Sequence, residues 1–171
     1  MFAKFVIITV FLLLSVNSLP SLRSSTDSTI QPISYDCLTC LYQTTPGCSN
    51  QHRPCLDNRC GPLCITKAYW EDAGKLTINN EKPSDPNASV HCLNDQDCAF
   101  NVVKSYTQRF AQDCNNDGVI NDEDYVRIHH LGGYGCNGAL NSDNERLINT
   151  CMNQKKNKNH YSFAGRTFKK E

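Results

Sequence analysis

Cysteine is the residue type that most restricts how this chain can fold. All eleven cysteines of the 171-residue chain lie between Cys37 and Cys151. Cysteines gathered in so short a stretch indicate a domain held together by disulfides, provided that the chain is exported, as its first residues indicate below. Cys37 and Cys40 have the spacing of half a zinc site, but no second pair at that spacing completes it. Because the count is odd, at least one thiol stays single or pairs with another chain.

The start of the chain has the pattern of a secretory signal peptide, which we place at residues 1–18. Lys4 supplies an early positive charge, an apolar run covers residues 5–14, and small or polar residues follow. The run is shorter than a membrane-spanning helix needs, and no later segment predicts one. Asn87 begins Asn-Ala-Ser, an acceptor sequence for N-glycosylation, in a stretch that we expect to be an exposed loop. The alternative is that this sequence stays unmodified. These features predict an extracellular protein.

Composition divides the rest of the chain into three parts. A polar segment covers residues 19–35, and one domain of ordinary size covers 36–151. Residues 152–171 are rich in lysine and contain a single acid, which predicts a disordered basic tail. This tail is either a solvated end or a surface that adheres to anionic bacterial envelopes. The formal net charge of the whole chain is zero, so nothing indicates nucleic acid as a partner.

Apolar spacing predicts a small, mainly α domain of the α+β class. Residues 49–64 are rich in proline, asparagine, glycine and cysteine, which predicts irregular backbone or a small hairpin. Elsewhere apolar residues recur at helical spacing, and glycines close several of these runs. The expected helices are a short one from Cys37, one at Ile65–Gly74, a central one at Ser89–Asp113, one at Glu123–Leu131 closed by Gly132 and Gly133, and a short last one at Leu140–Met152.

One loop has the pattern of a calcium site. Oxygen-bearing side chains recur through a twelve-residue stretch, and Gly118 occupies its sixth position. Calcium prefers about six to eight oxygen ligands, and such a loop can wrap it with one backbone carbonyl among them. The expected ligands are Asp113, Asn115, Asp117, Val119, Asn121 and Asp124. The alternative is an acidic turn before a helix, because Asn, Asp and Gly favour turns and helix caps without any metal.

Four stretches of the chain resemble, in order, the segments of a known family. They read CLTCLYQTTPGC, CGPLCITKAYW, CLNDQDCAFNVVKSYTQRF and RIHHLGGYGC, and they extend from Cys37 towards Cys151. The family is that of the invertebrate-type lysozymes, which includes destabilase, and the calcium-like loop looks most like its insect branch. The resemblance implies a lysozyme-like, α-rich α+β fold with a cleft. It also implies hydrolysis of the β-1,4 bond between N-acetylmuramic acid and N-acetylglucosamine, with isopeptidase activity in some members.

The residue that should protonate the departing sugar is missing from this pattern. Glycoside hydrolysis needs two carboxyl groups across the scissile bond, one protonated and one charged. In the family the acid lies in a sequence like CxxESGC, and the corresponding position here is Thr45. Asp57 is the candidate for the second carboxylate, and the start of an Asp-Asn turn is the other interpretation of it. Glu71 and Asp72 are candidates for a substitute acid near the cleft.

The residues that the resemblance implies for isopeptidase activity are also largely absent. The serine before Cys-Gly has no counterpart, and the position of the lysine is Thr66, with Lys67 displaced by one. His129 is the one match, to the family's histidine. Since His130 follows it on the same expected helix, a structural role for either histidine is the alternative to catalysis.

The resemblance also implies a disulfide pairing, from which this chain departs in part. The implied bridges are Cys40–Cys151, Cys55–Cys60, Cys92–Cys98 and Cys114–Cys136. The family commonly has cysteine where this chain has Tyr42, Ala73, Val102 and Asp122, and Cys64 stands where glutamine is usual. Three cysteines, Cys37, Cys48 and Cys64, then lack an inherited partner, and we expect two of them to pair anew.

Two functions are compatible with these observations. The first is an active secreted lysozyme that cuts peptidoglycan. The second is a lysozyme-like domain that has lost catalysis and still binds peptidoglycan or the bacterial surface in defence or digestion. Loss of the acid lowers the rate by orders of magnitude and leaves the sugar-binding surface intact, so Thr45 favours the second function.

Overall fold

The computed structural model describes residues 30–45, 48 and 54–164 of the chain. The signal peptide predicted at 1–18 and most of the polar segment predicted at 19–35 lie outside the described residues. The described part is mainly α-helical and has one small sheet, which is the predicted fold class.

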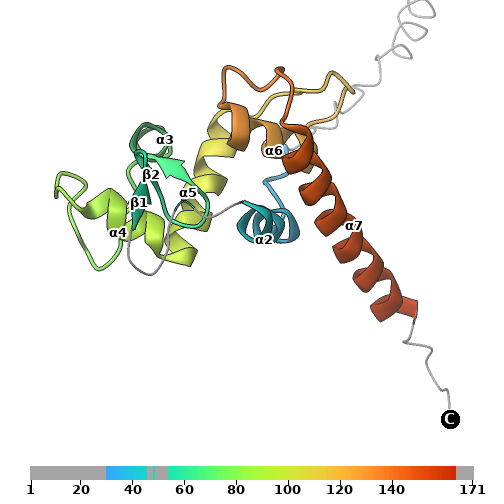
Figure 1. Cartoon of the computed structure of the whole chain (residues 1–171), viewed down its shortest axis with the longest axis horizontal. Helices are drawn as coiled ribbons and strands as arrows, with labels where there is room; N and C mark the ends of the chain where they lie inside the picture. Colours follow the sequence, from blue (N-terminus) through green and yellow to red (C-terminus); the bar gives the residue numbers. More distant parts are fainter. Residues whose placement is uncertain (1–29, 46–47, 49–53, 165–171) are drawn as a thin grey trace, which may run out of the picture.

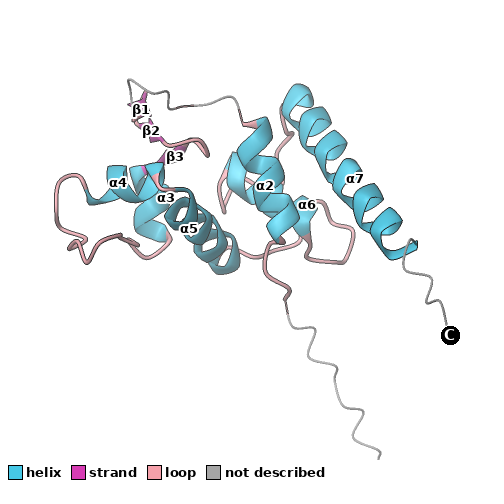
Figure 2. Cartoon of the chain, turned by 90° about the horizontal axis from the view of Figure 1, so that it is seen from below, coloured by secondary structure: helices cyan, strands magenta, loops and turns pink. Residues whose placement is uncertain are grey.

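The helices and strands form two groups in space. The elements are α2 (Tyr35–Thr44), β1 (Cys55–Leu56), β2 (Arg59–Cys60), β3 (Ile65–Thr66), α3 (Lys67–Asp72), α4 (Ala88–Asn94), α5 (Gln96–Arg109), α6 (Asp122–Leu131) and α7 (Ser142–Ala164). Helices α2, α6 and α7 lie together on one side, and the sheet lies with α3, α4 and α5 on the other (Figure 1). The same division is seen in the perpendicular view (Figure 2).

The folded domain begins earlier than the sequence predicted. Ser34 caps α2, and its hydroxyl accepts a hydrogen bond from the Cys37 amide (3.0 Å). Ser34 also donates to the Asp122 carboxylate from its own amide (2.9 Å) and hydroxyl (2.7 Å), which ties the start of α2 to α6. Ile33 is buried in the core. The last residues of the predicted polar segment are therefore part of the domain.

The sheet is a hairpin with a third short strand beside it. β1 pairs antiparallel with β2, and β2 pairs antiparallel with β3, so Cys60 lies opposite both Cys55 and Ile65. Asp57 and Asn58 both have positive φ (49° and 62°), the conformation of a two-residue hairpin turn. Asp57 therefore starts an Asp-Asn turn at the tip of the hairpin.

The helix predicted at Ile65–Gly74 is shorter than expected. Its first two residues form β3, and α3 begins at Lys67. The hydroxyl of Thr66 accepts a hydrogen bond from the Tyr69 amide (3.2 Å), so Thr66 serves as the helix cap. Trp70 is buried, and its indole nitrogen donates to the Leu76 carbonyl (2.7 Å). A threonine inside the apolar pattern thus marks a boundary that periodicity alone does not show.

The central helix predicted at Ser89–Asp113 is in fact two helices, α4 and α5. Asp95 separates them, because its backbone is extended (φ −86°, ψ 126°) and its carboxylate accepts a hydrogen bond from the Cys98 amide (2.8 Å). The Cys92–Cys98 disulfide spans this break. The apolar spacing continues across both helices, so the capping aspartate is the one local sign of the interruption.

Helix α6 agrees closely with its predicted range. The Asn121 side chain accepts a hydrogen bond from the Glu123 amide (2.8 Å), and the Asp124 carboxylate accepts one from the Asn121 amide (2.9 Å). These two bonds satisfy amides at the start of the helix, in a capping box. Gly132 ends α6 with φ 81°, as the glycine pair predicted.

Helix α7 corrects the prediction of a short last helix and, as far as Ala164, the prediction of a disordered tail at 152–171. Residues 165–171 of that tail lie outside the described residues. The helix begins at Ser142 and continues through the basic residues to Ala164, well beyond Met152. The reason lies in the sequence, because no glycine or proline occurs between Gly138 and Gly165 to interrupt the helix. Its final turns extend away from the other helices (Figure 1). Among the described residues, no helix combines the length and apolar character needed to cross a membrane.

The disulfides agree with the implied pairing and add one new bridge. Cys40–Cys151, Cys55–Cys60, Cys92–Cys98 and Cys114–Cys136 are all formed. The new bridge joins Cys48 to Cys64. Cys37 keeps a free thiol that is fully buried beside Asp122. Burial raises the pKa of the Cys37 thiol strongly, and the negative charge of Asp122 raises it further.

Candidate functional site

A cleft of about 500 Å³ lies between the two groups of elements. Its walls come from the end of α2, from β2 and β3, and from α3 and α6. Helix α5 and the start of α7 contribute further side chains. Thr45 and His129, two of the residues singled out from the sequence, both line this cleft. It is therefore the candidate functional site.

A second hollow, of about 570 Å³, lies along α6 and α7. It is lined mainly by acidic, amide and aliphatic side chains, with Cys37 among them, and it contains neither histidine nor an aromatic ring. None of the predicted catalytic residues lines it. Although this hollow is slightly larger, the chemistry that the sequence indicates is found in the cleft.

Two tyrosines from different helices form an aromatic floor in the cleft. The rings of Tyr69 and Tyr106 are stacked, with centroids 3.5 Å apart and planes inclined by 17°. The Tyr69 hydroxyl lies 3.3 Å from Nδ1 of His129. Burial raises the pKa of Tyr69 well above its ordinary value, and Tyr106 adds to this effect, so the Tyr69 hydroxyl keeps its proton. The floor is thus uncharged, with a hydroxyl that orients the histidine.

His129 is a neutral imidazole in this environment. Burial lowers the pKa of His129 to about 3, and the nearby His130 lowers it too, while a hydrogen bond with the Leu63 backbone acts in the opposite direction. Burial also lowers the pKa of His130. An imidazole with so low a pKa is a poor proton acceptor at neutral pH. The contacts of His129 with Tyr69 join α6 to α3, which supports the structural interpretation of this histidine.

Asp72 is the single carboxylate among the described residues that line the cleft. It lies 3.9 Å from the Arg109 guanidinium, and both side chains are about half exposed. Glu71 and Asp57 are exposed and do not line the cleft. No acidic residue occurs anywhere in 37–56, so the part of this stretch that the structure leaves undescribed adds no carboxylate. Among the described residues, the lining of the cleft therefore contains one carboxyl group, whereas glycoside hydrolysis uses two.

Thr45 stands at the end of α2, where the family has its acid. Its hydroxyl donates a hydrogen bond to the Leu41 carbonyl (2.7 Å), so it is turned back onto its own helix. The hydroxyl of Thr66 is engaged in capping α3, and Lys67 is exposed outside the cleft. No serine lines the described cleft. The groups expected for isopeptidase activity are therefore not assembled here.

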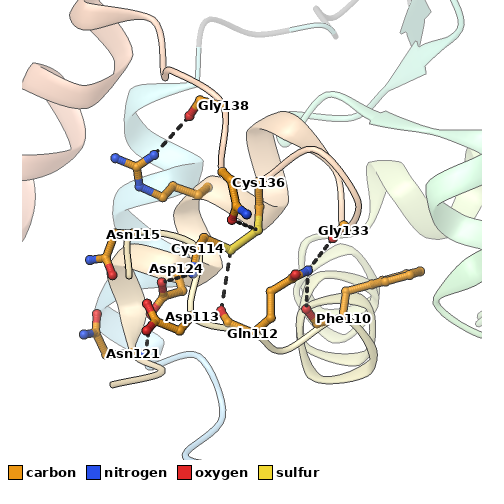
Figure 3. The surroundings of a disulfide bond; sticks show 12 residues. Phe110, Gln112, Asp113, Cys114, Asn115, Asn121, Asp124, Gly133, Cys136 and Gly138 are labelled. Atoms are coloured by element: carbon orange, nitrogen blue, oxygen red, sulfur yellow. Dashed lines mark hydrogen bonds between the residues drawn. A yellow bond between two sulfur atoms is a disulfide. The ribbon is translucent and has the colours of Figure 1, made fainter. Parts of the chain in front are cut away.

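The carboxylates of the predicted calcium loop accept hydrogen bonds from backbone amides. The Asp113 carboxylate accepts hydrogen bonds from two amides of its own loop (3.2 and 2.8 Å). Asp124 is fully buried, and it accepts from the amides of Cys114 (2.7 Å) and Asn121 (2.9 Å), near the Cys114–Cys136 disulfide (Figure 3). In the described part of the chain, no three His, Cys, Asp or Glu side chains are grouped so as to hold a metal. As it lies, Asp124 acts as a helix cap.

Several residues of the cleft were not recognised from the sequence. Tyr69 and Tyr106 have the spacing of ordinary core residues, and Arg59 and Asn144 lie in stretches with no motif. Tyr69 and Tyr106 are far apart in the chain, and they meet because α3 packs against α5. A single sequence carries no local signal for this contact.

Together, the fold and the cleft define a small, disulfide-rich α+β domain of the lysozyme-like class. A lysozyme from Magallana gigas is 35% identical over 109 residues, which cover 61% of this chain and 69% of that protein. Invertebrate-type lysozyme 3 from Caenorhabditis elegans is 32% identical over 107 residues, which cover 60% and 75%. The family model described as Destabilase matches residues 34–151. The chain therefore belongs to the Destabilase family.

Two solved lysozyme structures are also similar to this chain. The inhibitor-bound lysozyme from Meretrix lusoria is 27% identical, with a TM-score of 0.47 over 63% of this chain and 80% of that one. The lysozyme from Tapes japonica is 25% identical, with a TM-score of 0.45 over 70% of this chain and 88% of that one.

Proposed function

We propose that this chain is a secreted lysozyme-like protein that binds bacterial peptidoglycan in its cleft and has weak or no muramidase activity. Its relatives named as lysozymes support peptidoglycan as the ligand. The observation that supports the loss of activity is that Asp72 is the one carboxylate among the described residues of the lining. One carboxyl group cannot serve at once as the acid on one side of the sugar and as the nucleophile or base on the other.

The cleft retains features suited to binding a sugar. Tyr69, which is half-buried and stacked on the buried Tyr106, offers apolar surface, and Arg59 and Asn144 add hydrogen-bonding groups to the walls. Ligand sites typically combine apolar surface with a few polar groups that fix orientation. The neutral His129 adds no charge to the lining.

Secretion is part of this proposal. Five disulfides in so small a domain favour an oxidising compartment, in agreement with the predicted leader. Asn87 is exposed at the start of α4, where it is accessible to a glycan. A loss of mass after N-glycosidase treatment of the secreted protein tests that modification. A role in defence or digestion follows if the protein binds bacterial walls outside the cell.

Two assays on the same preparation test the proposal. We expect the protein to sediment with insoluble peptidoglycan and to leave the turbidity of Micrococcus cell walls at the level of a buffer control. Thr45→Glu places a carboxyl group where the family has its acid, and Thr44→Glu is the matched control one position earlier in α2. Because Thr45 lines the cleft with Asp72 and Thr44 does not, Thr45→Glu gives the lining a second carboxyl group, and any gain of lysis should appear in that variant and not in Thr44→Glu. Failure of the native protein to sediment contradicts the binding function.

The alternative function is an active lysozyme that hydrolyses β-1,4 bonds between N-acetylmuramic acid and N-acetylglucosamine. The names of its relatives are the observation in its favour. It requires Asp72 to act with a partner supplied by a movement of the Asp57 hairpin. Clear lysis by the native protein, abolished by Asp72→Asn, establishes this alternative.

We also propose calcium as a structural ligand of the loop at Asp113–Asp124. The exposed Asp117 and the half-buried Asn115, whose side chains lie 3.0 Å apart, support it, whereas the buried Asp124 opposes a full set of ligands. Calcium would link the two ends of the loop and stabilise the folded state by mass action. Calorimetry with calcium should show heat for the native protein and for the surface control Asp143→Ala, but none for Asp117→Ala. No heat from the native protein means that the loop is a turn.

A further inference from the structure

Tyr134 presents an aromatic ring almost entirely to solvent. The residue is 95% exposed, more than any other large apolar or aromatic residue in 30–45, 48 and 54–158, the part of the chain whose burial is described. It meets Phe110 edge to face, with centroids 5.3 Å apart and planes inclined by 72°. Tyrosine normally covers much of its ring against the protein. An exposed ring of this kind is therefore a candidate binding surface.

The turn that carries Tyr134 is held from both sides. The Gly133 amide donates to the Tyr106 hydroxyl (3.1 Å), and the Gln112 side chain donates to the Gly133 carbonyl (Figure 3). The Cys114–Cys136 disulfide fixes the far end of the turn. These bonds connect the turn to the end of α5 and to the loop before α6. The backbone under Tyr134 is thus fixed before any ligand arrives.

A close approach to Phe110 adds to this constraint. A Cβ atom at Gly133 would lie 2.3 Å from two atoms of the Phe110 ring, so no larger residue fits there without displacing it. The Phe110 ring in turn supports the edge of the Tyr134 ring. The absence of a side chain at Gly133 is what brings the turn down onto α5.

A continuous row of rings connects Tyr134 to the cleft. Tyr69 and Tyr106 form the cleft floor, Tyr106 lies 4.6 Å from Phe110 between centroids, and Phe110 lies 5.3 Å from Tyr134. Gly132, two residues before Tyr134, lines the cleft itself. Tyr134 does not line the cleft itself, but it is two residues from Gly132 and two ring contacts from Tyr106, which both line it.

We propose that Tyr134 is a sugar-stacking residue, which extends the cleft by one further binding position for a glycan strand. A pyranose ring has an apolar face of C–H groups, which pack against the face of an aromatic ring. Peptidoglycan is a polymer, so a strand held in the cleft continues past its end. Because the turn is already ordered, stacking costs little further conformational entropy. This inference rests on the proposed glycan-binding function.

Affinity for oligosaccharides of different lengths tests this position. The probes are N-acetylglucosamine oligomers of increasing length, measured by calorimetry with the full secreted protein. We expect Tyr134→Ala to weaken binding of the longer oligomers about two- to twelvefold, the range of one aromatic contact, and to leave the shortest unchanged. Tyr134→Phe keeps the ring and should retain the native affinities.

Tyr35→Ala is the matched control. Tyr35 is 65% exposed and meets Phe100 edge to face at 6.0 Å, but it lines neither the cleft nor the hollow beside α7. Its removal should change no affinity. Thermal unfolding of both alanine variants shows whether the fold is intact.

Each failure has a distinct meaning. Equal affinities of Tyr134→Ala and the native protein at every length, or an equal loss at every length, overturn the stacking position and leave the proposed function standing. If the native protein binds neither oligomers nor peptidoglycan, the proposed function fails and this inference fails with it. If it binds peptidoglycan alone, the decision rests on sedimentation, where Tyr134→Ala must bind less than Tyr35→Ala.

Discussion

Substitution of Gly61 by alanine should be among the most damaging single changes in this domain. Gly61 follows strand β2 and has φ of 70°, a left-handed conformation that residues other than glycine adopt at a cost. A Cβ atom there would lie 1.8 Å from the carbonyl oxygen of Leu93 and 2.7 Å from its carbon. Both are backbone atoms of α4, so no side-chain rotation relieves the overlap. The hairpin that forms one wall of the cleft would have to move away from α4.

The expected loss of stability has two parts. A non-glycine residue held in the left-handed region costs about 1 to 3 kcal/mol. Forcing an extra carbon into a packed contact typically adds about 1 to 3 kcal/mol. For Gly61→Ala we therefore expect a loss of about 2 to 6 kcal/mol. A domain of ordinary stability, about 5 to 15 kcal/mol, would lose much of it.

Gly74→Ala separates these two parts experimentally. Gly74 has φ of 101°, but a Cβ atom there would meet nothing within 4 Å. Denaturant unfolding of the oxidised proteins should show that Gly74→Ala lowers the free energy of unfolding only by the cost of the positive φ. Gly61→Ala should lower it clearly more, because the collision with α4 is added. Peptidoglycan sedimentation should fall for Gly61→Ala, because the cleft wall is displaced. Equal losses of stability in the two variants would refute the collision argument.

Three further predictions follow from burial and chain connectivity. The folded-state pKa of His129 is lowered from 6.5 to about 3, so the unfolded chain binds a proton that the folded protein excludes. The free energy of unfolding should therefore fall as the pH drops from about 6.5 towards 3. His129→Gln should reduce this fall, as denaturant unfolding at pH 7 and pH 4 would show. Replacing Cys40 and Cys151 by alanine should lower the free energy of unfolding by about 4.8 kcal/mol, because this bridge closes a separation of 111 residues. Removing any of the other bridges, whose separations run from 5 to 22, should lower it by about 2 to 3.4 kcal/mol. If removal of Cys40–Cys151 lowers stability less than removal of the others, the chain-entropy argument is wrong. The buried Cys37 thiol should not react with iodoacetamide in the native protein. In denaturant without reductant, mass spectrometry should show one label. Labelling of the native protein would contradict the burial of Cys37.

The predictions that succeeded rest on residues with strong local chemistry. Gly132 ends α6, and the Asp-Asn pair at Asp57 forms the hairpin turn, because few residues tolerate positive φ. The predictions that failed concern the limits of helices. Asp95 splits the central helix, and α7 continues past Met152, because apolar spacing reports which face of a helix is buried and says little about where the helix stops.

The amino-acid sequence by itself determined the class of the domain and the absence of an acid at Thr45, because these depend on residue identity. The pairing of four disulfides came from the resemblance to the family. Tertiary structure decided which groups meet in the cleft. It brought Tyr69 against Tyr106 and His129, left Asp72 as the one carboxylate of the described lining, and turned Asp57 away. The physical reason is that a site is formed by packing between distant segments, and such contacts leave no periodic or local mark in the chain.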